Sequence, residues 1–235
     1  MQIFPVQGIP EVQAGDDVAA LLAEAAPLQD GDILVVTHKI VSKAEGRLID
    51  LSTVTPSDFA RRFAEAWNKD ARAVELVLRE SRSILRMERG SLICETLHGQ
   101  VCANAGLDLS NAGEGKACLL PLDPDKSARR LHKRLGVPII ISDSFGRPWR
   151  IGIVNVAIGV AGMGSFTDYR GQDDPHGFPL KVSVMATADA LASAAELVMG
   201  KIAGVPAAVI RGFDPPPGNG SGAALVRERR GWFFR

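Results

Sequence analysis

The stretch "DKSARRLHKRLGVPIIISDSFGRPWR" (residues 125–150) contains three kinds of sequence pattern in direct succession. Residues 125–135 are basic with leucines at helical spacing, a pattern that predicts an amphipathic helix. The apolar run 137–141 predicts a buried strand, and the polar segment 142–150 predicts a tight turn at the end of that strand. A helix that leads directly into a buried strand is typical of α/β and α+β proteins.

The rest of the chain repeats this mixture of patterns. "TPSD" (55–58) predicts a helix start with Thr55 as N-cap. We therefore predict an α+β or α/β fold with a mixed β-sheet core, flanking helices and a small helical subdomain near residues 52–90, all within a single domain of residues 1–235. The predicted strands are 3–6, 33–36, 92–94, 101–103 and 205–212, and the predicted helices are 15–26, 60–67, 73–81 and the segment before Gly200.

Composition places the chain among ordinary globular proteins. Of its 235 residues 46% are hydrophobic, and 27 basic residues balance 27 acidic ones, so no global field attracts nucleic acid or an anionic membrane. Three cysteines without CxxC spacing indicate neither a disulfide framework nor a zinc site, and we expect them to be buried. The first residues lack a signal-peptide pattern, and no apolar run approaches the roughly 20 residues of a membrane helix. We predict a cytoplasmic protein.

Common nucleotide and hydrolase motifs are absent. The chain contains no GxxxxGK[ST] loop, no GxGxxG at a strand-to-helix turn, no HExxH and no GxSxG. Its four histidines are scattered along the sequence. Any chemistry must therefore come from another set of polar residues.

Three polar segments follow predicted strands. "CANAGLDLSN" (102–111) and "SDSFGRPWR" (142–150) each offer a carboxylate beside further oxygen ligands, which Mg²⁺ and Mn²⁺ prefer. "THKIVSKAEGR" (37–47) adds two lysines and an arginine. Acids that bind a metal and cations that bind phosphate are the groups that phosphoryl transfer requires.

Each segment also has an ordinary explanation. Asp108 suits turn capping, the segment 142–150 suits a surface turn with an ion pair, and the lysines of 37–47 suit a solvated strand end. The Gly-rich "AIGVAGMG" (157–164) suits tight packing as well as a platform for a planar ring. The basic helix 125–135 has an apolar face in a neutral protein, which favours a solvated basic face over nucleic-acid binding.

Several long motifs resemble one known family. "GDILVVTHKIVSKAEGR", "HGQVCANAGLDLSN", "LLPLDPDKSARRL", "ISDSFGRPWR" and "DYRGQDDPHG" occur in the order found in the coenzyme F-420:L-glutamate ligase family, also called F-420-0 γ-glutamyl ligases. The resemblance extends over nearly the whole chain. It implies the ligase fold of that family and the synthesis of coenzyme F-420.

The resemblance implies a specific reaction. The family joins L-glutamate to the side-chain carboxylate of coenzyme F-420-0 through an acyl phosphate formed with GTP, and adds further γ-linked glutamates. It implies two Mg²⁺ or Mn²⁺ ions, K⁺ as a further cation, and a homodimer. Some bacterial members carry an additional nitroreductase-like C-terminal domain, which we do not expect here. The alternatives are a metal-dependent phosphotransferase or hydrolase and a non-catalytic nucleotide- or deazaflavin-binding module.

The resemblance also assigns residues. Asp108 and Asp143 correspond to ligands of one divalent metal, and Ser144 to a ligand of a second. By chemistry alone we add Arg147 and Arg150 as clamps on phosphate or on the substrate carboxylate. The expected GTP-binding positions are Ile9, Pro10, Glu11, Val12, His38, Lys39, Lys43, Asn111, Met199, Gly200, Lys201, Ile202, Ala203, Gly204 and Val205.

Two positions depart from the pattern of some relatives. Lys201 stands where certain members carry a glutamate that supports the second metal, and His38-Lys39 replaces smaller hydroxyl residues. We predict that Lys201 binds phosphate or supplies the charge of that second ion. The aromatic segment "GWFFR" (231–235) is a candidate element of a dimer interface.

Overall fold

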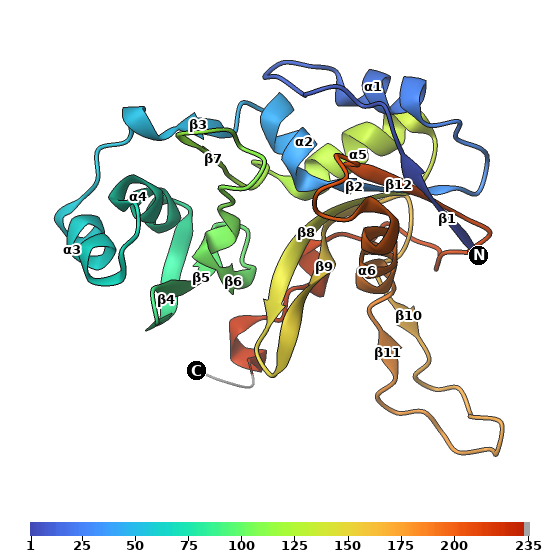
Figure 1. Ribbon diagram of the computed structural model, residues 1–235. Helices are drawn as coiled ribbons and strands as arrows, with labels where there is room; N and C mark the ends of the chain where they lie inside the picture. The colour runs from blue at the N-terminus through green and yellow to red at the C-terminus, as the bar shows by residue number, and fades with distance from the viewer. Residues whose placement is uncertain (233–235) are drawn as a thin grey trace.

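A five-stranded mixed sheet forms the centre of the computed structural model, which describes residues 1–232 (Figure 1). Its strand order is β1-β12-β2-β8-β9, and of its neighbouring pairs only β2 and β8 run parallel. The α+β fold class and the predicted mixed sheet are confirmed. The strands are β1 (Gln2–Val6), β2 (Ile33–Thr37), β8 (Ile139–Arg147), β9 (Arg150–Ala161) and β12 (Ala207–Arg211).

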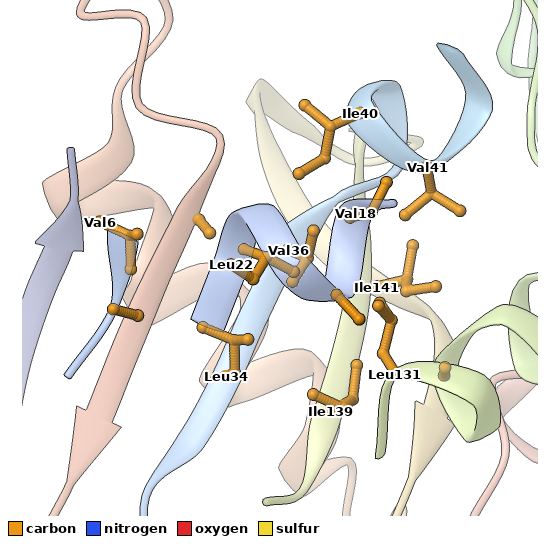
Figure 2. Packing of buried hydrophobic residues seen from close by; sticks show 14 of the residues in the cluster. Val6, Val18, Leu22, Leu34, Val36, Ile40, Val41, Leu131, Ile139 and Ile141 are labelled. Carbon is orange, nitrogen blue, oxygen red and sulfur yellow. The ribbon is translucent and has the colours of Figure 1, made fainter. Parts of the chain in front are cut away.

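Side-chain alternation along the central strands builds two hydrophobic cores. Leu34 and Val36 face α1 (Val18–Ala25), α2 (His38–Ala44) and α5 (Pro124–Leu135), as Figure 2 shows. Ile33 and Val35 face the opposite side, which α6 (Thr187–Met199) covers. Because both sheet faces are buried, the central strands are continuous apolar runs.

A smaller lobe lies beside the central sheet (Figure 1). Its helices pack on the sheet β4-β5-β6 through a separate apolar cluster, and Cys94 belongs to that cluster. The helices of the predicted subdomain are confirmed, but strand pairing makes the lobe a mixed unit instead of a helical one. Its elements are β3 (Leu48–Asp50), η1 (Leu51–Thr53), α3 (Asp58–Trp67), α4 (Ala71–Arg79), β4 (Ser81–Glu88), β5 (Ser91–Thr96), β6 (Val101–Ala103), η2 (Asn104–Gly106) and β7 (Lys116–Cys118).

The last third of the chain adds an arm and a packed tail. The arm is a two-stranded ribbon, β10 (Thr167–Asp168) and β11 (Val184–Met185), with a long connection that extends away from the sheet (Figure 1). The tail carries η3 (Ala223–Leu225) and η4 (Arg229–Gly231). It is tied to α5, because the Asp125 carboxylate accepts hydrogen bonds from two backbone N–H groups of the tail.

Three local predictions were wrong. The N-cap of α3 is Ser57, whose hydroxyl accepts from Ala60 N, so the helix begins three residues after Thr55. Residues 38–44 form the helix α2 and not a charged strand end. The segment 142–150 is not a tight turn, because β8 continues to Arg147 and pairs with β9 as a long hairpin.

Other predictions are confirmed. The three cysteines are free and buried. The "AIGVAGMG" segment packs tightly, since a Cβ on Gly159 would lie 2.4 Å from the backbone oxygen of Pro124. No helix within residues 1–232 has both the length and the apolar character required to cross a bilayer.

Candidate active site

The carboxyl ends of the parallel strands β2 and β8 bring the predicted residues together. Thr37 pairs with Ser142 at the end of the ladder, so the next residues, His38 and Asp143, lie side by side. Open α/β sheets bind ligands at such strand ends. A cavity of about 190 Å³ lies here. The predicted residues that line it are Ile9, Pro10, Glu11, Val12, His38, Lys39, Lys43, Asn111, Asp143, Ser144, Met199, Gly200, Lys201, Gly204 and Val205.

The cavity is small for a whole nucleotide. Pockets for drug-sized ligands hold about 300–1,000 Å³, so this one encloses part of such a ligand and leaves the rest outside. A second cavity of about 630 Å³ lies between α1, α2 and α5, but no predicted site residue lines it. We therefore take the smaller cavity as the candidate site.

His38 links helix α2 to Asp143. Its side chain is 2% exposed, with Nδ1 3.2 Å from the Ser42 hydroxyl and Nε2 3.3 Å from Asp143 Oδ1. Asp143 Oδ1 also accepts from the backbone N–H of Ser144 at 2.6 Å. Asp143 therefore lies against a histidine in a nearly buried position, and no arginine within the described residues forms the ion pair expected for this segment.

Lys39, the next residue, reaches the other predicted metal ligand. Its Nζ lies 2.7 Å from Asp108 Oδ2 and 2.9 Å from the Ser110 hydroxyl. Asp108 Oδ1 accepts from Ser110 N at 2.6 Å, so the turn-capping role is real as well. Burial raises the pKa of Asp108, but the hydrogen bonds from Lys39 and Ser110 outweigh burial and hold that pKa below its usual value.

Lys43 is a buried cation of the cavity wall. Its side chain is 8% exposed, and its Nζ lies 2.5 Å from Glu11 Oε1. The Glu11 side chain is 70% exposed. The interpretation of these lysines as solvated residues at a strand end is therefore wrong for Lys43. The exposed Glu11 can move away, which would free the ammonium for an anionic ligand.

Lys201 contacts a neutral partner. Its Nζ donates to the Ser144 hydroxyl, and that hydroxyl donates to Asn155 Oδ1 at 2.8 Å. Among the cavity lysines Lys39 and Lys43 are each paired with a carboxylate, whereas Lys201 has no ion pair within the described residues. Its charge is the least compensated of the three.

Five predicted residues do not line the cavity. Asp108 contacts the cavity residue Lys39 without lining the cavity itself, and Ile202 and Ala203 are both exposed, Ile202 at 99%. Arg147 and Arg150 pair at the end of the β8–β9 hairpin, where the Arg147 guanidinium donates to backbone oxygens of the hairpin itself. Their clamp role remains a prediction that the geometry does not support.

The oxygen donors suit a hard cation. No group of three or more His, Cys, Asp or Glu within residues 1–232 could hold a metal by itself. Two carboxylates, a hydroxyl and amide oxygens nevertheless suit Mg²⁺ or Mn²⁺, which commonly keeps waters and substrate phosphates as its other ligands. The residues fit a divalent ion that binds together with a phosphate-bearing ligand.

Six cavity residues were missed by the sequence analysis: Thr37, Ile40, Ser142, Asn155, Glu196 and Pro206. Asn155 is 6% exposed and stands alone as an amide among apolar neighbours of β9. A lone buried amide in an apolar strand is a usable signal, because such a group needs a partner. The other five have no comparable pattern.

Comparison with known proteins gives one consistent result. A family model described as F420-0:Gamma-glutamyl ligase matches residues 8–212, which include every segment that lines the cavity. The chain is similar to the coenzyme F420:L-glutamate ligase of Methanopyrus kandleri, with 49% identity over 92% of this chain and 88% of the relative. It is 45% identical to the enzyme so named of Methanothermobacter thermautotrophicus (91% and 89% covered) and 40% identical to that of Archaeoglobus fulgidus (97% and 93%).

Proposed function

Because the chain belongs to the F420-0:gamma-glutamyl ligase family, we propose that it joins L-glutamate to the side-chain carboxylate of coenzyme F-420-0, with GTP as co-substrate. The observation that carries this proposal is the cavity at the ends of β2 and β8. Lysines and carboxylates from four separate chain segments converge there, within the part of the chain that matches the family.

GTP has a clear chemical purpose in this reaction. A carboxylate is a poor electrophile, so amide formation in water is unfavourable. Transfer of the γ-phosphoryl group of GTP to the carboxylate gives an acyl phosphate and GDP. The glutamate amine then attacks the acyl carbon, the C–N bond forms, and phosphate leaves with the C–O bond electrons. The same steps on a γ-carboxyl would add further glutamates.

The cavity residues supply charge and positioning. Lys43 and Lys201 can donate to phosphate oxygens, and the backbone of residues 199–205 borders the same space. We assign one divalent ion to Asp108 and Asp143 and a second to Ser144. When bound, these ions neutralise the negative charge of the phosphates. Lys201 contacts Ser144, so its ammonium is in place to supply part of that charge.

The test is a mass-spectrometric assay. The protein is incubated with coenzyme F-420-0, GTP, L-glutamate and Mg²⁺ or Mn²⁺, with and without K⁺. We expect products heavier by one or more glutamate residues, and GDP in equal amount. GDP release that is independent of glutamate would favour a phosphotransferase or hydrolase, and nucleotide binding without turnover would favour a binding module. Either result would overturn the ligase proposal.

We also propose that the protein is a homodimer. The arm formed by β10, β11 and their connection exposes Phe178, Val182 and Met185 at 68%, 87% and 58%. Apolar surface of this kind marks protein interfaces. The other candidate element, 231–235, lies mostly outside the described residues, which end at 232. Light scattering at micromolar concentration should give the mass of two chains, and a monomer would contradict the proposal.

A further inference from the structure

Asn155 carries a hydrogen-bond donor that no group in the described part of the chain uses. The residue lies on β9 opposite Ser144 on β8, and it lines the cavity although it is only 6% exposed. Its Oδ1 accepts from the Ser144 hydroxyl at 2.8 Å. Within residues 1–232, no hydrogen bond involves its amide nitrogen.

The Ser144 hydroxyl bridges Lys201 and the Asn155 side-chain oxygen. The Lys201 ammonium can only donate, so Ser144 Oγ accepts from it and directs its own hydrogen to Asn155. The carboxamide turns its oxygen toward Ser144 and accepts that hydrogen. Its N–H₂ group then points away from Ser144 with both hydrogens available.

Structural needs do not explain an asparagine at this position. The other bond of the residue runs from the Ser193 hydroxyl on α6 to the backbone oxygen of Asn155, at 2.7 Å. Any residue could accept that bond. The bond to Ser144 requires a side-chain oxygen, which an aspartate would also provide. The N–H₂ group is what the amide alone contributes.

The same face of β8 presents a second incompletely satisfied group. Ser142 is two residues before Ser144, lines the cavity and is 1% exposed. Its hydroxyl has no hydrogen-bond partner within the described residues. Buried polar groups of native proteins rarely lack partners, so this wall of the cavity is built to receive a polar ligand or ordered water.

We infer that Asn155 is an anion-binding residue of this site. Its carboxamide N–H₂ group donates to a phosphate or carboxylate oxygen of a substrate that lies against Lys201. The ammonium supplies the charge that favours an anion, and Ser144 fixes the distance between the two donors. This assignment deepens the proposed ligase function and rests on it for the identity of the substrate.

Asn155→Asp is the variant that tests the donor most directly. It preserves the size of the side chain and the oxygen that Ser144 needs, and it replaces the N–H₂ donor with an oxygen that repels anions. Asn155→Ala removes the donor without adding a charge. Ser193→Ala is the matched control, because it removes the other bond to Asn155 and leaves the carboxamide untouched. Thermal unfolding of all three variants checks that the fold is retained.

Calorimetry with a non-hydrolysable GTP analogue and Mg²⁺ gives the first readout, and the KM values for GTP, F-420-0 and glutamate give the second. We expect Asn155→Asp to weaken the binding of one anionic ligand by about ten- to a hundredfold and Asn155→Ala to weaken it less. Ser193→Ala should change that binding by less than about threefold. Weaker binding of the analogue would assign the contact to a phosphate. A raised KM for F-420-0 or glutamate, with analogue binding intact, would assign it to a carboxylate.

Two outcomes would overturn the inference: a folded Asn155→Asp protein with wild-type binding and KM values, or an equal loss in Ser193→Ala. Failure of the ligase proposal is a separate result. It would appear as wild-type protein that forms no glutamylated product, while the calorimetric comparison of analogue binding still decides the role of Asn155. If Asn155→Asp does not fold, the uncharged Asn155→Ala protein supplies the same comparison.

Discussion

Replacing Asp143 with asparagine removes the charge beside His38 and keeps the shape of the side chain. In the structure Asp143 Oδ1 accepts from Ser144 N at 2.6 Å and lies 3.3 Å from His38 Nε2. Asparagine retains an oxygen for the first contact. The difference between a charge-assisted and a neutral hydrogen bond limits the expected loss of unfolding free energy to about 1–2 kcal/mol.

The expected effect on turnover separates two roles of Asp143. If the carboxylate only contacts His38, its replacement lowers the unfolding free energy by the amount given above and changes the turnover of the folded protein by less than about sixfold. If it binds a catalytic divalent ion, we expect a loss of about 4 kcal/mol of transition-state stabilisation, or roughly a thousandfold in rate. The two expectations differ by more than a hundredfold and cannot be confused.

Glutamate ligation by the Asp143→Asn and Asp108→Asn proteins is measured by mass spectrometry beside thermal melts with and without GTP and Mn²⁺. We expect folded, nearly inactive proteins that the ligands no longer stabilise. Asp50→Asn is the control, because this exposed carboxylate caps η1 away from the cavity. Near-normal turnover in both site variants would refute the metal site.

Three further predictions concern charge and packing. Lys201→Ala should lower the rate of glutamate ligation about tenfold, because the ammonium supplies positive charge beside Ser144. Lys201→Glu should regain activity as the Mn²⁺ concentration is raised. Unchanged kinetics in the Lys201→Ala protein would contradict this role. Arg211→Met should lower the unfolding free energy at pH 7 by about 2 kcal/mol, since the Arg211 hydrogen bonds hold the pKa of the fully buried Asp32 below its usual value. Asp32 contributes this stability above its unfolded pKa of about 4 and loses it as pH falls through the lower folded pKa, so urea titrations of the two proteins should converge in acid. Gly159→Ala should cost about 1–3 kcal/mol because its Cβ would lie 2.4 Å from a backbone oxygen of α5, whereas Gly146→Ala, with open space around it, should melt like the wild type.

Strong periodicity made most of the fold predictable from the sequence. The central strands were found because they are apolar runs, and α5 because basic residues alternate with leucines at helical spacing. Helix α2 was missed because its seven residues are too few to show a period, and lysines on a buried helix look like surface residues. The β8–β9 hairpin was read as a turn because "SDSFGR" is polar, although alternate residues face opposite sides of a strand.

The site was predictable only in part. The resemblance brought together residues 9–12, 38, 39, 43, 111, 143–144 and most of 199–205, which the structure places around one cavity. The resemblance did not predict which of these side chains contact one another. The contacts His38–Asp143 and Lys39–Asp108 form because α2 follows directly after β2. Arg147 and Arg150 were expected near the cavity on chemistry alone, because guanidinium groups bind phosphate and carboxylate, and the extended β8–β9 hairpin instead places them at its far end.

The strand order of the central sheet has a consequence for how the protein folds. Gln2 pairs with Arg211, and β2 pairs with β8 across more than a hundred residues, so the sheet has high contact order. Residues 9–12 follow β1, and residues 199–205 precede β12, so both cavity walls reach their places when these distant strands pair. A chain that has not completed this pairing has no substrate site, and the appearance of nucleotide binding during refolding should therefore report the slow formation of the β1–β12 ladder.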